Sequence, residues 1–419
     1  MQTGKELTKF TPRLRGDEFL NPHSLLNGEL SAEEALRFDG PDLQSYSAKV
    51  GGDEIRAVET QLKTQFEPTE AEALFLERGV EATTGYLRAR TVEGDFLAVY
   101  ESQARAMMDR LYTPAPAPLL AEAFSQVAII SSGMDESRFA KTIKRRAAYK
   151  YSHEELGGVR LVLHQIVLLV VLWPNSGTLR GLADNILAAL DEALGVTRFF
   201  SARMRGLSRN TPEPFIEVLL QLFNVGALYV YGINSDNVRS PTSNRAFSFL
   251  AEMPKAIGMP VWVSGSCALF NHLRGQPAAG YELLHNPPIE ISSYSFDDGS
   301  RMASAYWAGL PAAICERISE KTITAILEKS AFQRRLYVTA LTAVINGIMD
   351  NGMSSGKDQL AVADAALARH SGLITAISAA ARGNAISGEY KTRYQEFLPL
   401  STRYVAHGRK SPAPTSQDA

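Results

Sequence analysis

The stretch HQIVLLVVLWPNSGTLRGLADNILAALDEALG, residues 164–195, decides the fold of this chain. Its first part, Gln165–Trp173, is almost continuously apolar and lacks the alternation of a half-exposed strand. This pattern predicts a central strand of a parallel sheet, which is buried on both faces. Leu179–Leu194 then carries apolar residues at helical spacing and predicts an amphipathic helix. A buried strand followed by such a helix is the repeating unit of an α/β fold.

The same alternation continues on both sides of this stretch. We expect further strands at Phe124–Ser131, Ala227–Ile233 and Met259–Ser264. We expect helices between them at Glu136–Tyr149, Pro212–Phe223 and Ser243–Ile257. Strands and helices that alternate at this spacing predict a parallel sheet with helices on both faces.

The ends of the chain are predicted to be helical. N-terminal helices are expected at Ser31–Phe38, which starts with a capping box, and at Glu54–Phe66, Glu70–Arg90 and Asp95–Leu111. C-terminal helices are expected at Ser300–Trp307, Pro311–Lys329, Arg334–Asn351, Gln359–Arg369 and His370–Ala381. We predict four parts. Residues 1–95 form an N-terminal partner-binding extension, and residues 96–299 form an α/β core. Residues 300–405 form a helical lid domain, and residues 406–419 form a tail that is disordered by composition.

The composition is that of an ordinary globular protein. The chain has 419 residues, 45% of them hydrophobic, and a net charge of −2, so any nucleic-acid contact must come from a local basic patch. The two cysteines, Cys267 and Cys315, lie in apolar stretches and indicate a reduced, cytoplasmic protein. The most apolar run, Leu161–Trp173, is shorter than the ~20 residues that a membrane span needs. We therefore expect no membrane association.

Residues 164–195 resemble the second strand and following helix of the transposition ATPases, the AAA+ regulators of the TnsC, TniB and MuB group, and resemble TnsC most. Gly226–Asp236 falls where the acidic strand of that family belongs. Ala246–Gly265 resembles the stretch that ends in its sensor-one strand, and Tyr100–Ala121 resembles the helix before its core. The resemblance covers roughly residues 95–400. It implies an AAA+-like P-loop NTPase fold with a C-terminal helical lid domain and a mostly helical N-terminal extension.

The phosphate loop of such an ATPase has the form G-x-x-x-x-G-K-[ST]. Its glycines let backbone N–H groups close on the phosphates, its Lys neutralises them, and its hydroxyl holds Mg²⁺. The matching stretch is ISSGMDESRFAKTIKR, residues 130–145, with Gly133 as its only glycine. Counted from Gly133, the second glycine position holds Arg138. Counted from Ser132, Ser137 takes the second glycine position and Arg138 the Lys position.

The only Lys-hydroxyl pair nearby, Lys141–Thr142, lies too late in these registers. Asp135 and Glu136 put negative charge where a triphosphate would sit, and such acids suit the N-terminus of a helix without a bound anion. A displaced phosphate loop that uses Lys141 and backbone amides is the alternative interpretation.

The acidic strand end is also changed. The family's Asp-Glu pair would hold Mg²⁺ and orient the attacking water, and here the pair reads Tyr231-Gly232. Ser266 replaces the sensor-one Thr, and Arg274 alone stands near the place of the family's paired arginines. We therefore predict a pseudo-ATPase with no catalytic residue, no metal and no cofactor. The residues of this degenerate nucleotide site are Ser132, Gly133, Ser137, Arg138, Lys141, Thr142, Tyr231, Gly232 and Ser266.

Basic residues could meet DNA phosphates without reading sequence. One cluster, Lys144, Arg145 and Arg146, lies in a predicted helix, where a solvated helix face is the simpler interpretation. The resemblance adds three candidates near the second core helix, namely Arg160, Thr178 and Arg180. The histidines show no metal-ligand spacing.

The leading hypothesis is an inactive AAA+-like subunit of a DNA transposition complex, acting as an adaptor or a target-DNA platform. Its expected partners are an active ATPase paralogue, a transposase or a target selector, with duplex DNA as a further candidate, and it is expected to form an oligomer or hetero-oligomer. Two alternatives stay open, a weakly active ATPase with a displaced phosphate loop and a self-assembling DNA-binding scaffold. An unrelated α/β protein would also give the alternation of strands and helices.

Overall fold

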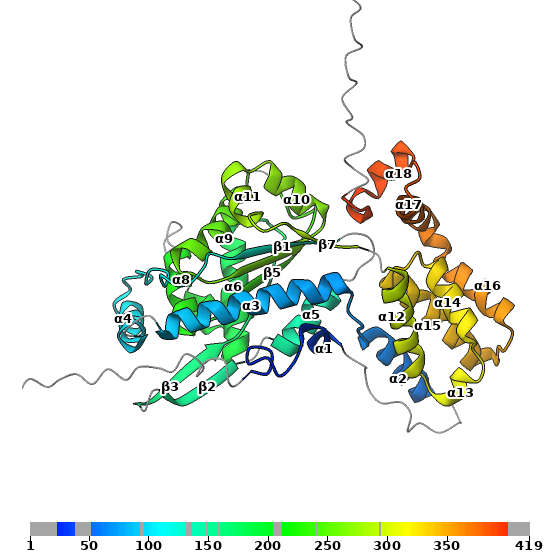
Figure 1. The fold of residues 1–419 in the computed structure, drawn as a ribbon, viewed down its shortest axis with the longest axis horizontal. Coiled ribbons are helices and arrows are strands. Elements are labelled where there is room, and N and C mark those ends of the chain that lie inside the picture. Colours follow the sequence, from blue (N-terminus) through cyan, green and yellow to red (C-terminus); the bar gives the residue numbers. More distant parts are fainter. Residues whose placement is uncertain are drawn as a thin grey trace, which may run out of the picture.

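The computed structural model describes residues 23–37, 52–92, 96–130, 136–147, 150–156, 159–203, 212–239, 241–292 and 295–400. An α/β core built around a sheet is followed by a helical C-terminal domain (Figure 1). The expected fold class, a parallel sheet flanked by helices with a helical domain after it, is confirmed.

The sheet of the core has five strands in the order β4-β5-β6-β1-β7, and every neighbouring pair is parallel. The strands are β1 (Ser125–Ile130), β4 (Leu169–Leu172), β5 (Leu228–Ile233), β6 (Val261–Gly265) and β7 (Ile289–Ile291). All residues of β1 and β6 are buried, as strands between two helical layers require. Because the pairs are parallel, the carboxyl ends of all five strands lie along one edge of the sheet.

Helices cover both faces of the sheet. One face, with Val127 and Val263, packs with α6 (Leu179–Leu194), α8 (Pro212–Leu222), α9 (Asn244–Ala256), α10 (Cys267–Arg274) and α11 (Pro277–Leu283). The other face, with Ala128 and Trp262, packs with α3 (Glu70–Val92) and α5 (Glu136–Ala147). Successive strand residues thus enter opposite cores, as the two-residue period of a strand dictates.

Helix α3 runs along the sheet (Figure 1). A side chain at Gly79 of this helix would overlap the ring of Trp262, so glycine lets the helix approach the strand closely. The other N-terminal helices are α1 (Ala32–Leu36), α2 (Gly52–Thr64) and α4 (Phe96–Asp109). Helix α1 has the predicted capping box between Ser31 and Glu34, and α2 packs on α15 (Arg334–Asn351) of the helical domain. The partner-binding role of residues 1–95 stays a prediction.

The helical domain consists of α12 (Phe296–Ala308), α13 (Ala312–Cys315), α14 (Glu320–Lys329), α15 (Arg334–Asn351), α16 (Gly356–Leu367), η2 (Ala368–His370), α17 (Ser371–Ala381), α18 (Gly388–Arg393) and η3 (Gln395–Phe397). One run within it, Gly356–Ala381, is long and apolar enough to cross a membrane by length and composition, which is weak evidence on its own. The predicted C-terminal tail lies outside the described residues.

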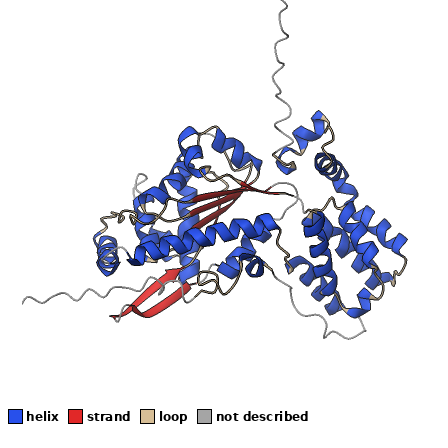
Figure 2. Ribbon diagram, in the orientation of Figure 1, coloured by secondary structure: helices blue, strands red, loops and turns tan. Residues whose placement is uncertain are grey.

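The prediction of a single central strand at Gln165–Trp173 is wrong. Those residues end β3 (Val159–Ile166), pass through a buried link and then form β4, which lies at an edge of the described sheet. Strand β3 pairs antiparallel with β2 (Lys150–Leu156) in a hairpin apart from the sheet (Figure 2). The apolar run is continuous because the link, Val167 and Leu168, is as buried as the strands. Next to the link, Gly226 N donates a hydrogen bond to Ile166 O at 2.9 Å.

The prediction of one helix over Pro311–Lys329 is also wrong, because α13 and α14 are separate. Ser319 adopts an extended backbone and its hydroxyl accepts a hydrogen bond from Thr322 N, so it starts a new helix. The sequence also left β7, α10, α11 and the short helix α7 (Phe199–Arg203) unassigned.

A candidate nucleotide site at the carboxyl edge of the sheet

Strands β1, β5 and β6 and the first turn of α5 meet at the carboxyl edge of the sheet, where ligands of open α/β folds bind. Ser132 and Gly133, which the sequence places in the phosphate loop, lie outside the described residues. The described part of the site consists of the start of α5, the end of β5 at Gly232 and the end of β6 at Ser264.

Glu136, the first residue of α5, places its carboxylate between the ends of β5 and β6. Its Oε1 accepts hydrogen bonds from Gly232 N at 2.9 Å and from Ser264 Oγ at 2.6 Å. Gly232 has a φ of 86°, a left-handed backbone that glycine adopts readily. The hydroxyl of Tyr229 lies 2.8 Å from Ser264 Oγ. A connected polar cluster with a carboxylate at its centre therefore holds this edge together.

The negative charge of Glu136 affects the two tyrosines of β5, Tyr229, which is buried, and Tyr231, which is half-buried. Burial raises the pKa of Tyr229 well above its usual value of 10, and the negative charge of Glu136 raises it further. The pKa of Tyr231 is raised for the same two reasons, with burial first. Negative charge near these hydroxyls disfavours a second negative group. A triphosphate placed here would meet the same repulsion.

Two other α5 residues of the predicted site, Arg138 and Thr142, have hydrogen-bond partners away from the ends of β5 and β6. Arg138 Nη1 donates to the hydroxyl of Tyr306 on α12 at 3.4 Å, so its side chain reaches toward the helical domain. Thr142 is buried and its Oγ1 donates to Arg138 O at 3.0 Å. Ser137 and Lys141 are exposed on the helix. The Thr142 hydroxyl is therefore hydrogen-bonded within the helix, while the Lys141 side chain is exposed.

Ser266 and residues 395–400 lie together at the same edge of the sheet. Ser266 caps α10 by accepting from Ala268 N, and its Oγ donates to Glu396 Oε1 at 3.4 Å. The same Glu396 oxygen accepts from Ser235 N at 2.8 Å. Leu398 is buried, and Leu400 N donates to Glu290 Oε1 at 2.9 Å. We call Gln395–Leu400 the C-terminal strap, since it ties the helical domain to the core.

A buried ion pair makes a second tie between the two parts. Arg334 of α15 donates to both carboxylate oxygens of Glu72 on α3, at 3.1 and 2.8 Å, and the two side chains are 0% and 1% exposed. Arg334 also donates to Glu67 O at 2.8 Å, and its guanidinium lies 3.9 Å from the ring centroid of Phe66. Thr69 N donates to Glu72 at 2.9 Å.

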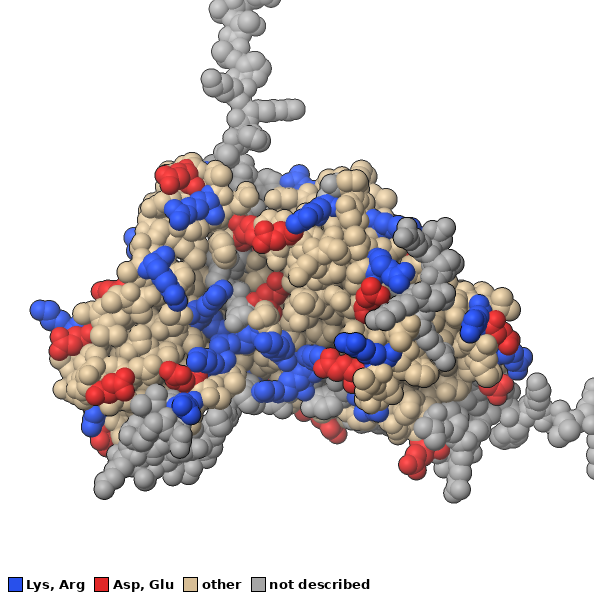
Figure 3. Space-filling model, turned by 180° about the vertical axis from the view of Figure 1, so that it is seen from behind, with Lys and Arg blue, Asp and Glu red and all other residues tan. Residues whose placement is uncertain are grey.

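The predicted DNA-binding residues lie on three elements, α5, the start of α6 and β3. On α5, Lys144 forms an ion pair with Glu192 at 2.7 Å, and Arg145 is exposed. At the start of α6, Thr178 caps the helix by accepting from Gly181 N, and Arg180 lies 3.8 Å from Asp184. Arg146 is in α5 and Arg160 in β3, but their side chains are outside the described set. Figure 3 shows Lys and Arg gathered across the middle of one face, with acidic side chains among them.

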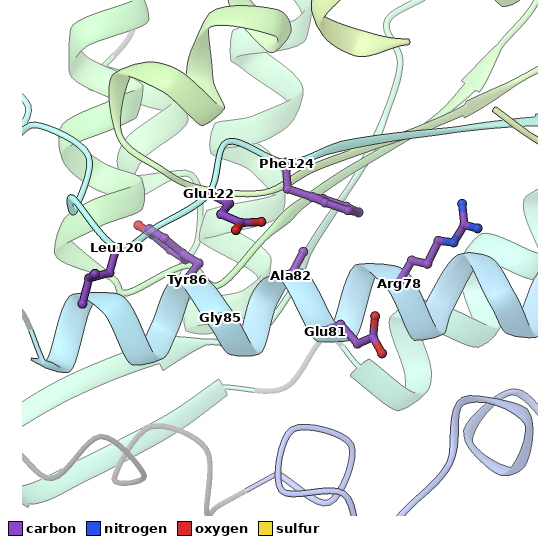
Figure 4. Close-up of a pocket in the computed structure, with 8 residues that line it drawn as sticks. All are labelled: Arg78, Glu81, Ala82, Gly85, Tyr86, Leu120, Glu122 and Phe124. Atoms are coloured by element: carbon purple, nitrogen blue, oxygen red, sulfur yellow. The ribbon is translucent and has the colours of Figure 1, made fainter. Parts of the chain in front are cut away.

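A cavity of about 410 Å³ lies away from this edge, between α3 and the segment that leads into β1. Tyr86, Phe124 and Leu120 line it together with Arg78, Glu81 and Glu122 (Figure 4). Because Phe124 directly precedes β1, the cavity belongs to the amino end of the sheet. Among the described residues, no group of three or more His, Cys, Asp or Glu side chains could hold a metal ion.

No protein-family model matches the chain, and no curated protein does. Solved structures similar to it include the Aeropyrum pernix ORC2 protein in ADPNP–ADP complexes, at 13% identity and a TM-score of 0.41 over 74% of this chain and 83% of that one. The Thermotoga maritima RuvB Holliday junction branch migration motor has 12% identity and a TM-score of 0.35 over 72% and 83%. A Walker-type ATPase of Pyrococcus abyssi has 12% and 0.38 over 73% and 86%. Likeness at this level concerns architecture alone and says nothing of activity here.

Proposed function

We propose that this chain is a catalytically inactive, AAA+-like subunit of a DNA transposition complex. It acts as an adaptor or a target-DNA platform beside an active ATPase paralogue, a transposase or a target selector. The observation that carries the inactive part is the Glu136 carboxylate, which accepts from Gly232 N and Ser264 Oγ at the sheet edge.

The chemistry of that edge supports the loss of nucleotide. A phosphate cradle needs unoccupied N–H and hydroxyl donors with a cation beside them. Here a carboxylate takes both donors, and the strand position that would carry the metal-binding acid holds Tyr231. A hydrolase also needs a base to orient the attacking water. Glu136, Glu290 and Glu396 lie at the described edge, and all three carboxylates accept hydrogen bonds from the protein.

The ties between the core and the helical domain support a static role. The buried Glu72–Arg334 pair and the C-terminal strap join the two parts through contacts between the protein's own residues. A subunit whose domain arrangement is set by its own side chains offers partners a constant surface. The transposition context rests on the resemblance of residues 164–195 and 226–265 to that ATPase family, and the DNA-platform role rests on the basic residues of α5.

Equilibrium titration with a fluorescent ATP analogue and Mg²⁺ tests the inactive part. We expect no saturable binding by the wild-type chain up to millimolar nucleotide, and the same for Lys141→Ala. Micromolar binding by the wild-type chain that Lys141→Ala abolishes would overturn the proposal and favour a displaced phosphate loop.

The transposition context has a separate test. We expect the tagged chain, purified from cells of its source, to retain a transposase or an intact paralogous ATPase encoded beside its gene. Neighbouring genes that encode neither protein would contradict this part of the proposal and leave the nucleotide result unaffected.

A further inference from the structure

The C-terminal strap, Gln395–Leu400, lies on a surface that the α/β core provides. Its hydrogen-bond partners there are Ser235 after β5, Ser266 at the start of α10, and Glu290 in β7. Each of these residues lies in a strand of the parallel sheet or within two residues after one. The sheet therefore holds the partners of the strap in place whether or not the strap is docked. We call this surface the strap groove.

The first anchor of the strap is the carboxylate of Glu396. Its Oε1 accepts hydrogen bonds from Ser235 N at 2.8 Å and from Ser266 Oγ at 3.4 Å. Ser266 is also the N-cap of α10, and negative charge near the N-terminus of a helix is stabilising. This end of the strap groove therefore recognises a carboxylate.

Two leucines form the second anchor. Leu398 is only 2% exposed, and Cys267 Sγ donates to its main-chain oxygen at 3.6 Å. Leu400 packs against the apolar core, and its N–H donates to Glu290 Oε1 at 2.9 Å. Pro399 favours the extended backbone of Leu398, whose φ and ψ are −95° and 145°, so part of the strap is set in its docked shape by local sequence. The groove thus recognises an extended segment in which a carboxylate and two leucines occupy alternate positions.

The connection that carries the strap is exposed. Residues 382–387 join α17 to α18 and are exposed apart from Ile386, which is half-buried. Helix α18, drawn in red at the outside of the helical domain in Figure 1, has 6 residues, all at least partly exposed. The buried Glu72–Arg334 pair joins the helical domain to the core before this connection. The strap can therefore leave its groove while the rest of the helical domain stays in place.

We propose that the strap groove also accepts the strap of a second copy of this chain, so that two copies are linked by an exchange of straps. The strap of a second copy fits because it has the same sequence as the strap that fills the groove here. Exchange keeps every contact of the strap and changes only the copy that supplies it, which makes it a low-cost route to dimers. Residues 382–387 span about 20 Å when extended, which lets α18 and the strap swing outward together. The exchange concerns self-assembly and does not depend on the loss of nucleotide binding.

A labelled peptide tests recognition by the full-length chain. The probe is fluorescein-labelled YQEFLPL, the sequence of Tyr394–Leu400. The tethered strap of the wild-type chain competes with the probe, so Glu396→Ala/Leu398→Ala, whose own strap no longer fits, should bind the probe about tenfold more tightly or better. A probe with alanine at the same two positions should bind neither chain. Equal binding by the two chains, or none by the variant, would refute the groove. If thermal unfolding shows that the double variant is misfolded, Glu396→Gln takes its place.

A shortened connection tests the exchange itself. Deleting Ala385 and Ile386 keeps the hydrogen bonds that end α17 and start α18, but shortens the connection by about 7 Å, so that the strap no longer reaches its own groove. In light scattering after gel filtration, we expect this variant to have about twice the wild-type mass at equal concentration. The matched control adds Leu398→Ala to the same deletion and should keep the wild-type mass. A wild-type mass for the deletion alone, or a doubled mass for the control, would rule out exchange. The ATP titration is a separate measurement, so failure of either leaves the other interpretable.

Discussion

Removing Arg334 should destabilise the chain strongly, because it would strand a carboxylate between the core and the helical domain. Glu72 and Arg334 are almost fully buried and bond through both carboxylate oxygens. Breaking a buried pair from one side costs about 3–5 kcal/mol. In Arg334→Met, the stranded Glu72 keeps its hydrogen bonds from Thr69, so we expect the lower end, about 3 kcal/mol.

The opposite variant should cost more. Glu72→Met removes the carboxylate partner of the buried guanidinium, which keeps its contacts with Glu67 O and the Phe66 ring. It also removes the side chain that accepts from Thr69 N at the start of α3, an interaction worth about 1 kcal/mol. We therefore expect about 4–5 kcal/mol. The double variant Glu72→Met/Arg334→Met buries no stranded charge, so it should be no less stable than Glu72→Met alone. The costs of the two single variants then exceed the cost of the double variant by about 3 kcal/mol, which is the coupling energy of the pair.

Urea unfolding followed by circular dichroism and by tryptophan fluorescence measures these differences, and coincident curves would justify a two-state treatment. Arg335→Met is the matched control, because Arg335 is the exposed neighbour on the same helix and should cost less than about 0.5 kcal/mol. A cost below about 1 kcal/mol for Arg334→Met, or strictly additive single variants, would refute the reasoning.

Three further outcomes follow from the described packing and charges. Burial and nearby acidic side chains raise the pKa of Glu217 from 4.5 to about 7, so the folded protein binds this proton more tightly than the unfolded chain does. The free energy of unfolding should then fall as the pH rises from 4.5 to 7. Over this range the thermal midpoint of Glu217→Gln should fall less than that of the wild type. Equal pH dependence of the two midpoints would contradict the raised pKa. Gly79→Ala should lower the free energy of unfolding in urea by about 1–3 kcal/mol, because the added methyl group would overlap the Trp262 ring. Gly85→Ala, where the methyl group would meet open space, should raise the free energy of unfolding by about 0.5–1 kcal/mol. Equal effects of the two variants would contradict this packing. If α5 contacts DNA, Arg145→Gln should reduce the salt slope of duplex binding by about 1, and an unaltered slope would place the contact elsewhere.

Local signals were sufficient for most helices. The predicted bounds of Leu179–Leu194 and Arg334–Asn351 match α6 and α15. Thr178 caps the first of these helices, and both are followed by a glycine with positive φ, Gly195 at 72° and Gly352 at 63°. Such caps depend on neighbours in sequence, so a single sequence reveals them.

Features set by distant residues could not be read in this way. The boundary between β3 and β4 lies inside one apolar run, because the link between them is as buried as the strands. Strand β7 has only three residues and exists through its pairing with β1.

The site shows the same limit. The sequence predicts the negative charge of Glu136, but Gly232 and Ser264 lie 96 and 128 residues away, so no spacing could identify them as its partners. The Glu72–Arg334 pair spans 262 residues and left no local signal either.

The position of β1 inside the sheet has a consequence for synthesis. Its two partners, β6 and β7, come later in the chain, and the first residue of β6, Val261, lies about 130 residues after Ile130. At a synthesis rate of ~5–20 residues per second, the ribosome needs roughly 7–26 seconds to reach Val261. During that interval the apolar strand Ser125–Ile130 has neither of its final hydrogen-bonding neighbours. The nascent chain is therefore exposed to aggregation, and production should improve with chaperones or slower expression.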